Sequence, residues 1–306
     1  MNIQLLHNDE IDLFQWDYTV NTSVNSSVFG FSWFLEALDK DWYGLTTEGY
    51  QHIMPVLFSH SYKCSFIDTV GVLPLHAIYS RQMLCKDVNT HFLLFLKDKV
   101  PYLHISLDKM TAVYDYLHLK TYTLPSFELD LITSYKWKQQ RYSANLIKNL
   151  HVMKQRGYSV RKEQDSSLAK NKFAKRYSGT HKTTIQLSGK QFKRLIGKLD
   201  HYHLCSYYGA YSSSGSCIAL AMFVKTQHHY LLLATWQNKR NAKLPLLALI
   251  IDQFLQVNSE KALTLYLDNL MGSAYSTELT GLGAKRSHQT LVKQGTKHWF
   301  QRIKIS

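Results

Sequence analysis

A carboxylate stands at the end of a strongly apolar segment. Asp268 ends the run ALTLYLD and is followed by Met271-Gly272-Ser273. Loops at strand ends carry reactive groups in α/β folds, and a carboxylate there can orient a nucleophile or accept its proton. Capping of a helix that begins near Ser273 explains Asp268 almost as well. We therefore take Asp268 as the first catalytic candidate and Ser273 as a substrate-binding candidate, and leave the capping role open.

Three more side chains stand where consecutive strand-like segments close. Tyr211 closes the first segment, Lys225 the second and Trp236 the third. We expect these side chains to line one cleft, with Tyr211 as a second catalytic candidate and Lys225 and Trp236 as substrate contacts. Ordinary strand residues are the alternative, because aromatic side chains are common in sheets.

The histidine pairs suggest a metal site only weakly. His201-Tyr202-His203 and His228-His229 offer neighbouring imidazoles, but no third ligand stands at a fitting spacing. The motifs GxSxG, HExxH and GxxxxGK[ST] are also missing from the sequence. The sequence therefore predicts no metal, and it argues against a hydrolase, a zinc protease and a nucleoside triphosphatase.

The positive charge is concentrated in the middle of the chain. The net charge is +14, and the segment 136–194 carries 16 Lys or Arg against Glu163 and Asp165. Such a segment attracts polyanions, among them the phosphates of tRNA, a nucleotide sugar or coenzyme A. Lys148 and Lys154 are our substrate-binding candidates within it. Solvated helix faces are the alternative.

Length and composition indicate a folded chain with room for two domains. The 306 residues are 45% hydrophobic and 19% charged. No apolar run approaches the ~20 residues of a membrane helix, and the start MNIQLLHNDEIDLFQW does not resemble a secretory signal. The four cysteines show no CxxC spacing. We expect a cytoplasmic protein with reduced thiols and no membrane span.

Periodicity and turn residues predict alternating helices and strands. Helices are expected at 26–38, 87–98, 134–140, 143–157, 165–179, 188–200, 246–254 and 273–283. Strands are expected at 42–59 as a hairpin across Glu48-Gly49, then at 100–107, 112–124, 158–163, 205–212, 217–226, 228–237, 262–268, 289–293 and 298–305. Pro125 is expected to end a strand. The three strands from 205 to 237 should form an antiparallel meander, within an α/β chain of mixed sheets.

Several of these stretches resemble the GNAT superfamily of acyltransferases, and its Fem-type branch most closely. LPSFELDL followed by RYSANLIKNLHVMKQRGYSV is similar to the Fem-type succession of a strand, a helix with Ser, Asn and basic residues, a Gly and a strand. SVFGFSWFLEAL with WYGL and YQHIMPVL resembles the opening of the first domain. LYLDNLMGSAYSTELTGLGAKRSHQTLVK resembles the family's ending, with Leu282 where the family often has Phe; the matching positions are Asp268, Gly272, Ser273, Gly283 and Ala284.

The resemblance implies two tandem GNAT-like domains and transfer of an acyl or aminoacyl group to an amine. The domains would be 1–125 and 126–306, with the basic helical segment 136–194 in the second. Such a site holds the donor and the amine together, stabilises an oxyanion with a backbone N–H and accepts a proton. Asp268 would orient the amine or take its proton.

The resemblance also points to a donor-binding turn. Classical members place the pyrophosphate of coenzyme A on a Gly-rich turn before a helix. The matching positions here lack glycine, although they carry basic and amide groups: Lys239, Arg240, Asn241, Ala242 and Lys243. Without glycine the backbone approaches phosphates less closely, which argues against acetyl-CoA and favours the Fem-type donor, aminoacyl-tRNA. A solvated turn is the alternative.

The predicted function is therefore N-acyltransfer from a phosphate-bearing donor. One alternative is a catalytically silent module of the same fold that docks on nucleic acid or an acidic partner, with the missing glycines recording the loss of cofactor use. Another is a modifier of sugar nucleotides or cell-envelope precursors.

Overall fold

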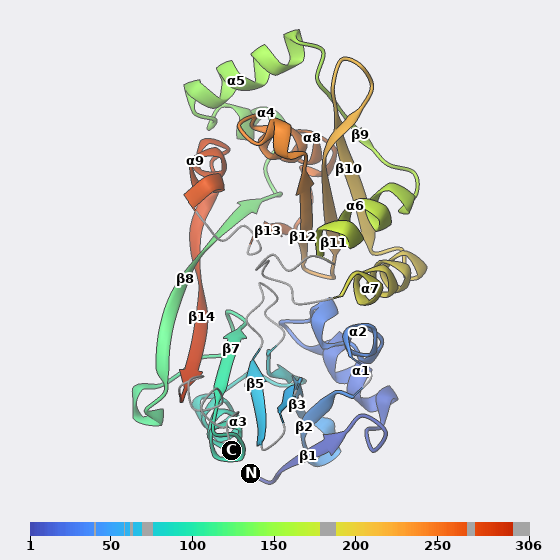
Figure 1. The fold of residues 1–306 in the computed structure, drawn as a ribbon. Helices are drawn as coiled ribbons and strands as arrows, with labels where there is room; N and C mark the ends of the chain where they lie inside the picture. The colour runs from blue at the N-terminus through green and yellow to red at the C-terminus, as the bar shows by residue number, and fades with distance from the viewer. Residues whose placement is uncertain are drawn as a thin grey trace, which may run out of the picture. The chain divides into compact units, whose positions relative to one another are not determined.

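The computed structural model describes residues 1–39, 41–57, 59–61, 64–68, 76–177, 188–267 and 273–295 (Figure 1). Within these residues the chain divides into two compact units. Unit 1 holds the residues up to Leu124 together with those from Gln289, and unit 2 holds those from Pro125 to His288. Two strands, β8 (Lys120–Asp130) and β14 (Lys285–Gln294), contribute residues to both units.

Unit 1 contains an antiparallel sheet in the order β1-β2-β3-β6. The strands β2 and β3 form the hairpin predicted across Glu48-Gly49, where Gly49 adopts a positive φ of 61°. The elements of this sheet and its helices are β1 (Ile3–His7), α1 (Leu13–Thr22), α2 (Ser32–Leu38), β2 (Tyr43–Thr47), β3 (His52–Val56) and β6 (Tyr79–Ser80).

Further strands of unit 1 form the succession β4-β5-β7-β14. The pair β5–β7 is parallel, and β7–β14 is antiparallel. The helix α3 covers an apolar core that includes Phe92, Leu103 and Val292. The bounds are β4 (Ser59–Ser61), β5 (Cys64–Asp68), α3 (Lys86–Lys99) and β7 (Leu103–Leu107).

The helix expected at 26–38 is wrong in its first half. Val28–Gly30 forms a separate 3-10 turn, and α2 begins only at Ser32. The reason is a contact with a distant residue. Asp17 accepts hydrogen bonds from the backbone N–H and the hydroxyl of Ser32, both at 2.7 Å, and so satisfies a donor that the first turn of a helix leaves open.

The strand expected to end at Pro125 runs through it. β8 begins at Lys120 and continues to Asp130, and Asp115–Leu117, expected as strand, forms a 3-10 turn. Beyond Pro125, the residues Glu128 to Asp130 pair with β13. Proline removes one donor from a strand but keeps an extended backbone, so pairing further along can carry the strand onward.

Unit 2 is built on a mixed sheet in the order β8-β13-β12-β11-β10-β9. Every neighbouring pair is antiparallel except β12–β13, which is parallel. The meander β10-β11-β12 is therefore confirmed. The bounds are β9 (Ser159–Lys162), β10 (Cys205–Tyr211), β11 (Cys217–Lys225), β12 (His229–Gln237) and β13 (Thr264–Tyr266).

Helices lie on both faces of this sheet. The apolar helix α8 packs against β9, β10 and β11 and shares a core with Tyr208, Phe223 and Leu232. The helix α6 contacts β12, and the helix α7 contacts β10. Both lie on the face of the sheet opposite to α8, since successive side chains of a strand point to opposite faces. The bounds are α4 (Tyr135–Gln139), α5 (Ala144–Gln155), α6 (Ser167–Tyr177), α7 (Gly189–His201), α8 (Leu246–Asn258) and α9 (Ser273–Gly281).

The helix expected at 143–157 is confirmed as α5. The Ser143 hydroxyl accepts the Leu146 N–H, Leu146, Leu150 and Met153 are buried, and Gly157 has a φ of 78° just beyond the last turn. The remaining face of α5 carries exposed basic residues, among them Lys148.

Candidate functional site

Two adjacent parallel strands of unit 2 pair over only part of their length. The pairs between β12 and β13 run from His229↔Thr264 to Leu231↔Tyr266, where β13 ends. β12 continues for six more residues to Gln237 (Figure 1). Beyond this point the parallel pairing with β13 has ended, and β12 keeps its antiparallel pairing with β11 up to the next turn. Asp268 follows the end of β13 by two residues and lies outside the described residues.

A β-bulge interrupts β12 just after the last of these pairs. Ala234 pairs with Met222 and Leu232 with Phe223, which leaves Leu233 as an extra residue. Bulges re-aim backbone groups and are common next to active sites. The bulge is the feature of β12 that sequence periodicity could not predict, because every residue around it is apolar.

Polar side chains gather at one end of the meander, on the face that α6 covers. We call Glu163, Lys172, Tyr211, Cys217 and Trp236 the meander-end cluster. Tyr211 donates its hydroxyl hydrogen to Glu163 at 2.8 Å. The ammonium of Lys172 lies 4.3 Å from the ring centroid of Trp236, close enough for a cation–π contact. All five residues are half-buried.

Two groups of the meander-end cluster, the Tyr211 hydroxyl and the Cys217 thiol, are held in their neutral forms. Burial, and then the hydrogen bond to Glu163, raise the pKa of Tyr211 above its ordinary value. Burial, and then the charge of Glu163, raise the pKa of Cys217 to about 11. A neutral thiol is a poor nucleophile, so this arrangement suits binding better than covalent catalysis through Cys217.

The three strand-closing residues do not gather at one place. Tyr211 pairs with Cys217 at the start of β11, and Trp236 pairs with Leu220 nearby. Lys225 pairs with Tyr230 at the other end of β11 and is exposed. The expectation of one shared cleft is therefore wrong for Lys225, because neighbouring antiparallel strands bring the end of one beside the start of the next.

The turn after β12 is closed by its own hydrogen bonds. Asn238 accepts the N–H of Arg240 through its side chain and the N–H of Asn241 through its carbonyl, and Lys239 accepts the N–H of Ala242. The side chains of Lys239, Arg240 and Lys243 are exposed, as is Ala242, and Asn241 is half-buried. The turn thus offers mobile cations to a phosphate, whereas three of its backbone donors already have partners.

The first turn of α8 already receives a carboxyl group. Glu278, in α9, accepts the backbone N–H of Ala248. Burial raises the pKa of Glu278 to about 7. Its Oε2 atom is buried without a hydrogen-bond partner among the described residues. A phosphate at this helix end would therefore meet a carboxyl group that already occupies the favourable position. α9 begins at Ser273, whose side chain is not described.

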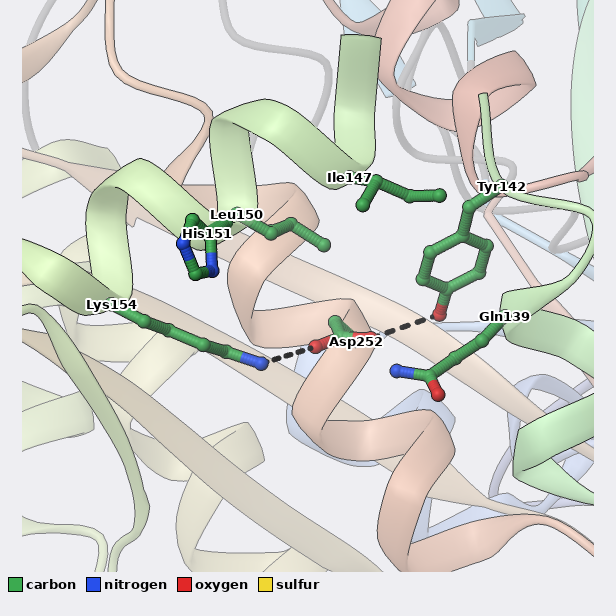
Figure 2. Close-up of a pocket in the computed structure, with 7 residues that line it drawn as sticks. All are labelled: Gln139, Tyr142, Ile147, Leu150, His151, Lys154 and Asp252. Carbon is green, nitrogen blue, oxygen red and sulfur yellow. Dashed lines mark hydrogen bonds and ion pairs between the residues drawn. The ribbon is translucent and has the colours of Figure 1, made fainter. Parts of the chain in front are cut away.

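The outer face of α8 carries a buried carboxylate at the floor of a pocket (Figure 2). Asp252 is 3% exposed and accepts hydrogen bonds from the hydroxyls of Tyr135 at 2.8 Å and Tyr142 at 3.0 Å. Lys154, predicted as a phosphate contact, instead reaches Asp252 at 3.4 Å, while Lys148 is exposed.

Sequence reasoning missed Asp252, Glu163 and Glu278. A usable signal existed for Asp252, since it is the one charged residue in the helix LLALIIDQFLQVN. From the sequence, Glu163 stands out only as one of the two acidic residues of the basic segment 136–194. For Glu278 no local signal existed, because its partner belongs to another helix.

The central basic residues are only partly free on the surface. Lys138 is buried, donates to the Thr133 carbonyl at 2.7 Å and lies 3.7 Å from Asp130. Lys170 lies 3.3 Å from Asp200. Lys138 is therefore not one of the solvated cations of this segment, because a carbonyl, a hydroxyl and a carboxylate together replace its water.

The described part of the chain holds neither a cluster of metal ligands nor a helix that could span a membrane. No group of three His, Cys, Asp or Glu side chains there is arranged to hold a metal ion. His201 is the last residue of α7, and His203 follows that helix, so the pair does not lie on a strand. Of the helices described, none combines the length and the hydropathy required to cross a bilayer.

Comparison with known proteins identifies the fold but no relative by sequence. No family model and no curated protein matches the sequence. The structure is similar to that of FemX, with a TM-score of 0.62 at 10% identity over 98% of this chain and 99% of FemX.

Two further solved structures agree with this result. The C-terminal domain of a putative lysylphosphatidylglycerol synthetase from Agrobacterium fabrum gives a TM-score of 0.59 at 10% identity, over 93% of this chain and 92% of that one. An acetyltransferase of the GNAT family from Colwellia psychrerythraea gives 0.53 at 10% identity, over 97% and 100%. The chain has a Fem-like GNAT fold, and the predicted mixed α/β fold class is confirmed.

Proposed function

We propose that the protein is an N-acyltransferase that moves an acyl or aminoacyl group to an amine. The observation that carries the proposal is the arrangement of β12 and β13, in which parallel pairing stops at Leu231↔Tyr266 and a bulge follows at Leu233. A donor carbonyl placed beside this bulge would meet a backbone N–H that is re-aimed out of the regular ladder.

The reaction needs an attacking nitrogen, an oxyanion donor and a proton acceptor. The amine attacks the carbonyl carbon, the C–N bond forms, and the bond to the leaving sulfur or oxygen breaks. The proton released by the amine passes to a base, and the leaving group takes up a proton. We assign the first proton transfer to Asp268 and the second to Tyr211, whose hydroxyl is hydrogen-bonded to Glu163. Trp236 and Ser273 are assigned to substrate contacts.

The donor we favour is aminoacyl-tRNA. The turn 239–243 has exposed cations but no glycine, and several of its amides are bonded within the turn. Glu278 adds a carboxyl group at the first turn of α8. Both features oppose a pyrophosphate held on backbone N–H groups, as coenzyme A requires, while Lys239, Arg240, Lys243 and Lys148 remain available to phosphates of a larger donor.

The same closed turn also supports a second candidate, a binding module without catalysis. In that case the exposed cations would dock on nucleic acid or an acidic partner, and no transfer would occur. The two candidates differ in whether a donor is consumed.

A transfer assay separates them. Protein is mixed with either radioactive acetyl-CoA or tRNA charged with radioactive amino acids, together with a pool of small and peptidyl amines, and acid-stable amide product is measured. The proposal expects label in an amide from aminoacyl-tRNA that depends on intact protein. Retention of tRNA on the protein at low salt without any amide product would favour the binding module, and amide product from acetyl-CoA alone would correct the donor.

A further inference from the structure

The outer face of α8 holds a charge that the proposed transfer does not use. Asp252 is buried, and every other buried residue of α8 except Asn258 is apolar. A buried carboxylate is costly unless hydrogen bonds and an opposite charge compensate it. An apolar residue at this position would pack without the cost of removing a carboxylate from water. The presence of Asp252 therefore indicates that its charge interacts with a partner.

The two oxygens of Asp252 are not equally satisfied. Oδ1 accepts both tyrosine hydroxyls, from Tyr135 and Tyr142, at 2.8 and 3.0 Å. Oδ2 meets Lys154 at 3.4 Å, the one partner it has among the described residues. An ammonium–carboxylate hydrogen bond is ordinarily about 2.7–2.9 Å long. Lys154 therefore holds Oδ2 loosely, and its side chain is 57% exposed.

A cavity opens above this oxygen. Its volume is about 290 Å³, near the lower limit of about 300 Å³ for small-molecule pockets. Figure 2 shows Asp252 at its floor, with Lys154 and His151 on one side and Tyr142 and Gln139 on the other. Ile147 and Leu150 give it an apolar wall, and Ile147 is 51% exposed, which is unusual for so apolar a side chain in a helix.

We propose that this pocket binds a free α-amino acid or a similar small zwitterion. The ligand ammonium takes the place of the Lys154 ammonium on Asp252 Oδ2. Lys154, once released, and His151 one turn earlier on α5 then face the ligand carboxylate. The side chain of the ligand lies on Ile147 and Leu150.

The spacing of the two protein charges sets the ligand class. Lys154 leaves Asp252 when the ligand ammonium binds, but it stays attached to α5 beside the pocket, so the complementary charges of the ligand must be close together. An ammonium and a carboxylate on one carbon meet that requirement. An amine alone would leave Lys154 displaced without a new partner, and a carboxylate alone would meet Asp252 as a like charge.

The test uses three probes with the same five-carbon chain. L-Norvaline carries both charges, pentylamine only the ammonium and pentanoate only the carboxylate. Binding to the full-length protein is measured by calorimetry and by ligand-observed NMR. The proposal expects saturable binding of norvaline at millimolar concentration or below, at least tenfold tighter than either single-charge probe. Equal binding of pentylamine or pentanoate, or no binding of norvaline, overturns it.

Variants locate the site independently of any transfer activity. Asp252→Asn should weaken norvaline binding at least tenfold, and Lys154→Met should remove most of the preference for norvaline over pentylamine. Ile147→Trp changes an exposed residue and should fill the pocket, so it tests the site even if Asp252→Asn fails to fold. Lys136→Met, at an exposed position of α4 outside the pocket, is the control. Unchanged binding in Ile147→Trp contradicts the proposal.

Discussion

The carboxyl group of Glu278, in α9, accepts a hydrogen bond from the backbone N–H of Ala248, in the first turn of α8. The contact joins two helices of unit 2 that are separated in sequence by β13. It places an ionisable group at the first turn of α8, and it makes the stability of unit 2 depend on pH.

The sign of that dependence follows from the raised pKa. Burial raises the pKa of Glu278 from 4.5 to about 7 in the folded protein. Between these values the unfolded chain loses the proton while the folded chain keeps it, so the free energy of unfolding falls as pH rises from about 4.5 to about 7. Glu278→Gln removes this contribution. We expect the melting temperature of the variant, relative to wild type, to be higher at pH 8 than at pH 5.

Melting curves at several pH values check this prediction. The exposed Glu48→Gln in unit 1 is the matched control. Replacing the carboxyl group with an amide can itself change the melting temperature, but by the same amount at every pH. The prediction therefore concerns only how the difference in melting temperature between Glu278→Gln and wild type changes with pH. A difference between Glu278→Gln and wild type that stays flat from pH 5 to pH 8 would show that the Glu278 carboxyl is ionised throughout.

A second prediction concerns the meander-end cluster. A Cβ added at Gly209 would lie 2.6 Å from Glu163 Oε1 and 2.9 Å from Tyr211 Cε2. Both atoms belong to side chains that can move, so Gly209→Ala should separate Tyr211 from Glu163 rather than shift the backbone. We expect a loss of about 1.5–3 kcal/mol, the contribution of a hydrogen bond to a charged group.

Urea unfolding measures this loss, and another glycine provides the control. Gly197 lies inside α7 with nothing within 4 Å of an added Cβ. Gly197→Ala should therefore stabilise the protein by about 0.5–1 kcal/mol, because alanine is the better helix residue. If Gly209→Ala also stabilises, the Tyr211–Glu163 contact contributes nothing to folding.

The correct sequence predictions concern short-range features. Ser143 caps α5 through the N–H of Leu146, three residues away, and Gly49 turns a hairpin whose strands adjoin it. The errors concern partners that are distant in sequence. The start of α2 depends on Asp17, and the course of β8 beyond Pro125 depends on pairing with β13.

The same distinction applies to the site. Residue type and strand ends correctly placed Tyr211 and Trp236 at one end of the meander, but Lys225 lies at the other end because strand direction alternates. Asp252 and Tyr142 are 110 residues apart, so only the folded chain reveals their contact. An isolated acid in an apolar helix is the local sign that a partner must exist.

A third prediction tests the base. Asp268→Asn keeps the size and the hydrogen-bonding oxygen of the side chain but cannot accept the proton of the amine. We expect the transfer rate to fall about 10²–10⁴-fold, the range for a general base, with a melting temperature near that of wild type. A drop in melting temperature together with intact transfer would assign Asp268 to capping the helix that follows.

A fourth prediction tests the donor contacts on the turn after β12. Lys239, Arg240 and Lys243 are exposed, and replacing all three with alanine removes three positive charges without burying a polar group. If the donor is a tRNA, each lost phosphate contact should reduce the slope of log affinity against log salt by about 0.9, and binding should weaken most at low salt. Filter retention of aminoacyl-tRNA across a salt series measures the slope. Lys120→Ala, at an exposed position of β8, is the control for general loss of charge. Binding and slope equal to those of wild type in the triple variant would remove the turn from the donor site and leave Lys148 and its neighbours on α5 as the remaining basic surface to test.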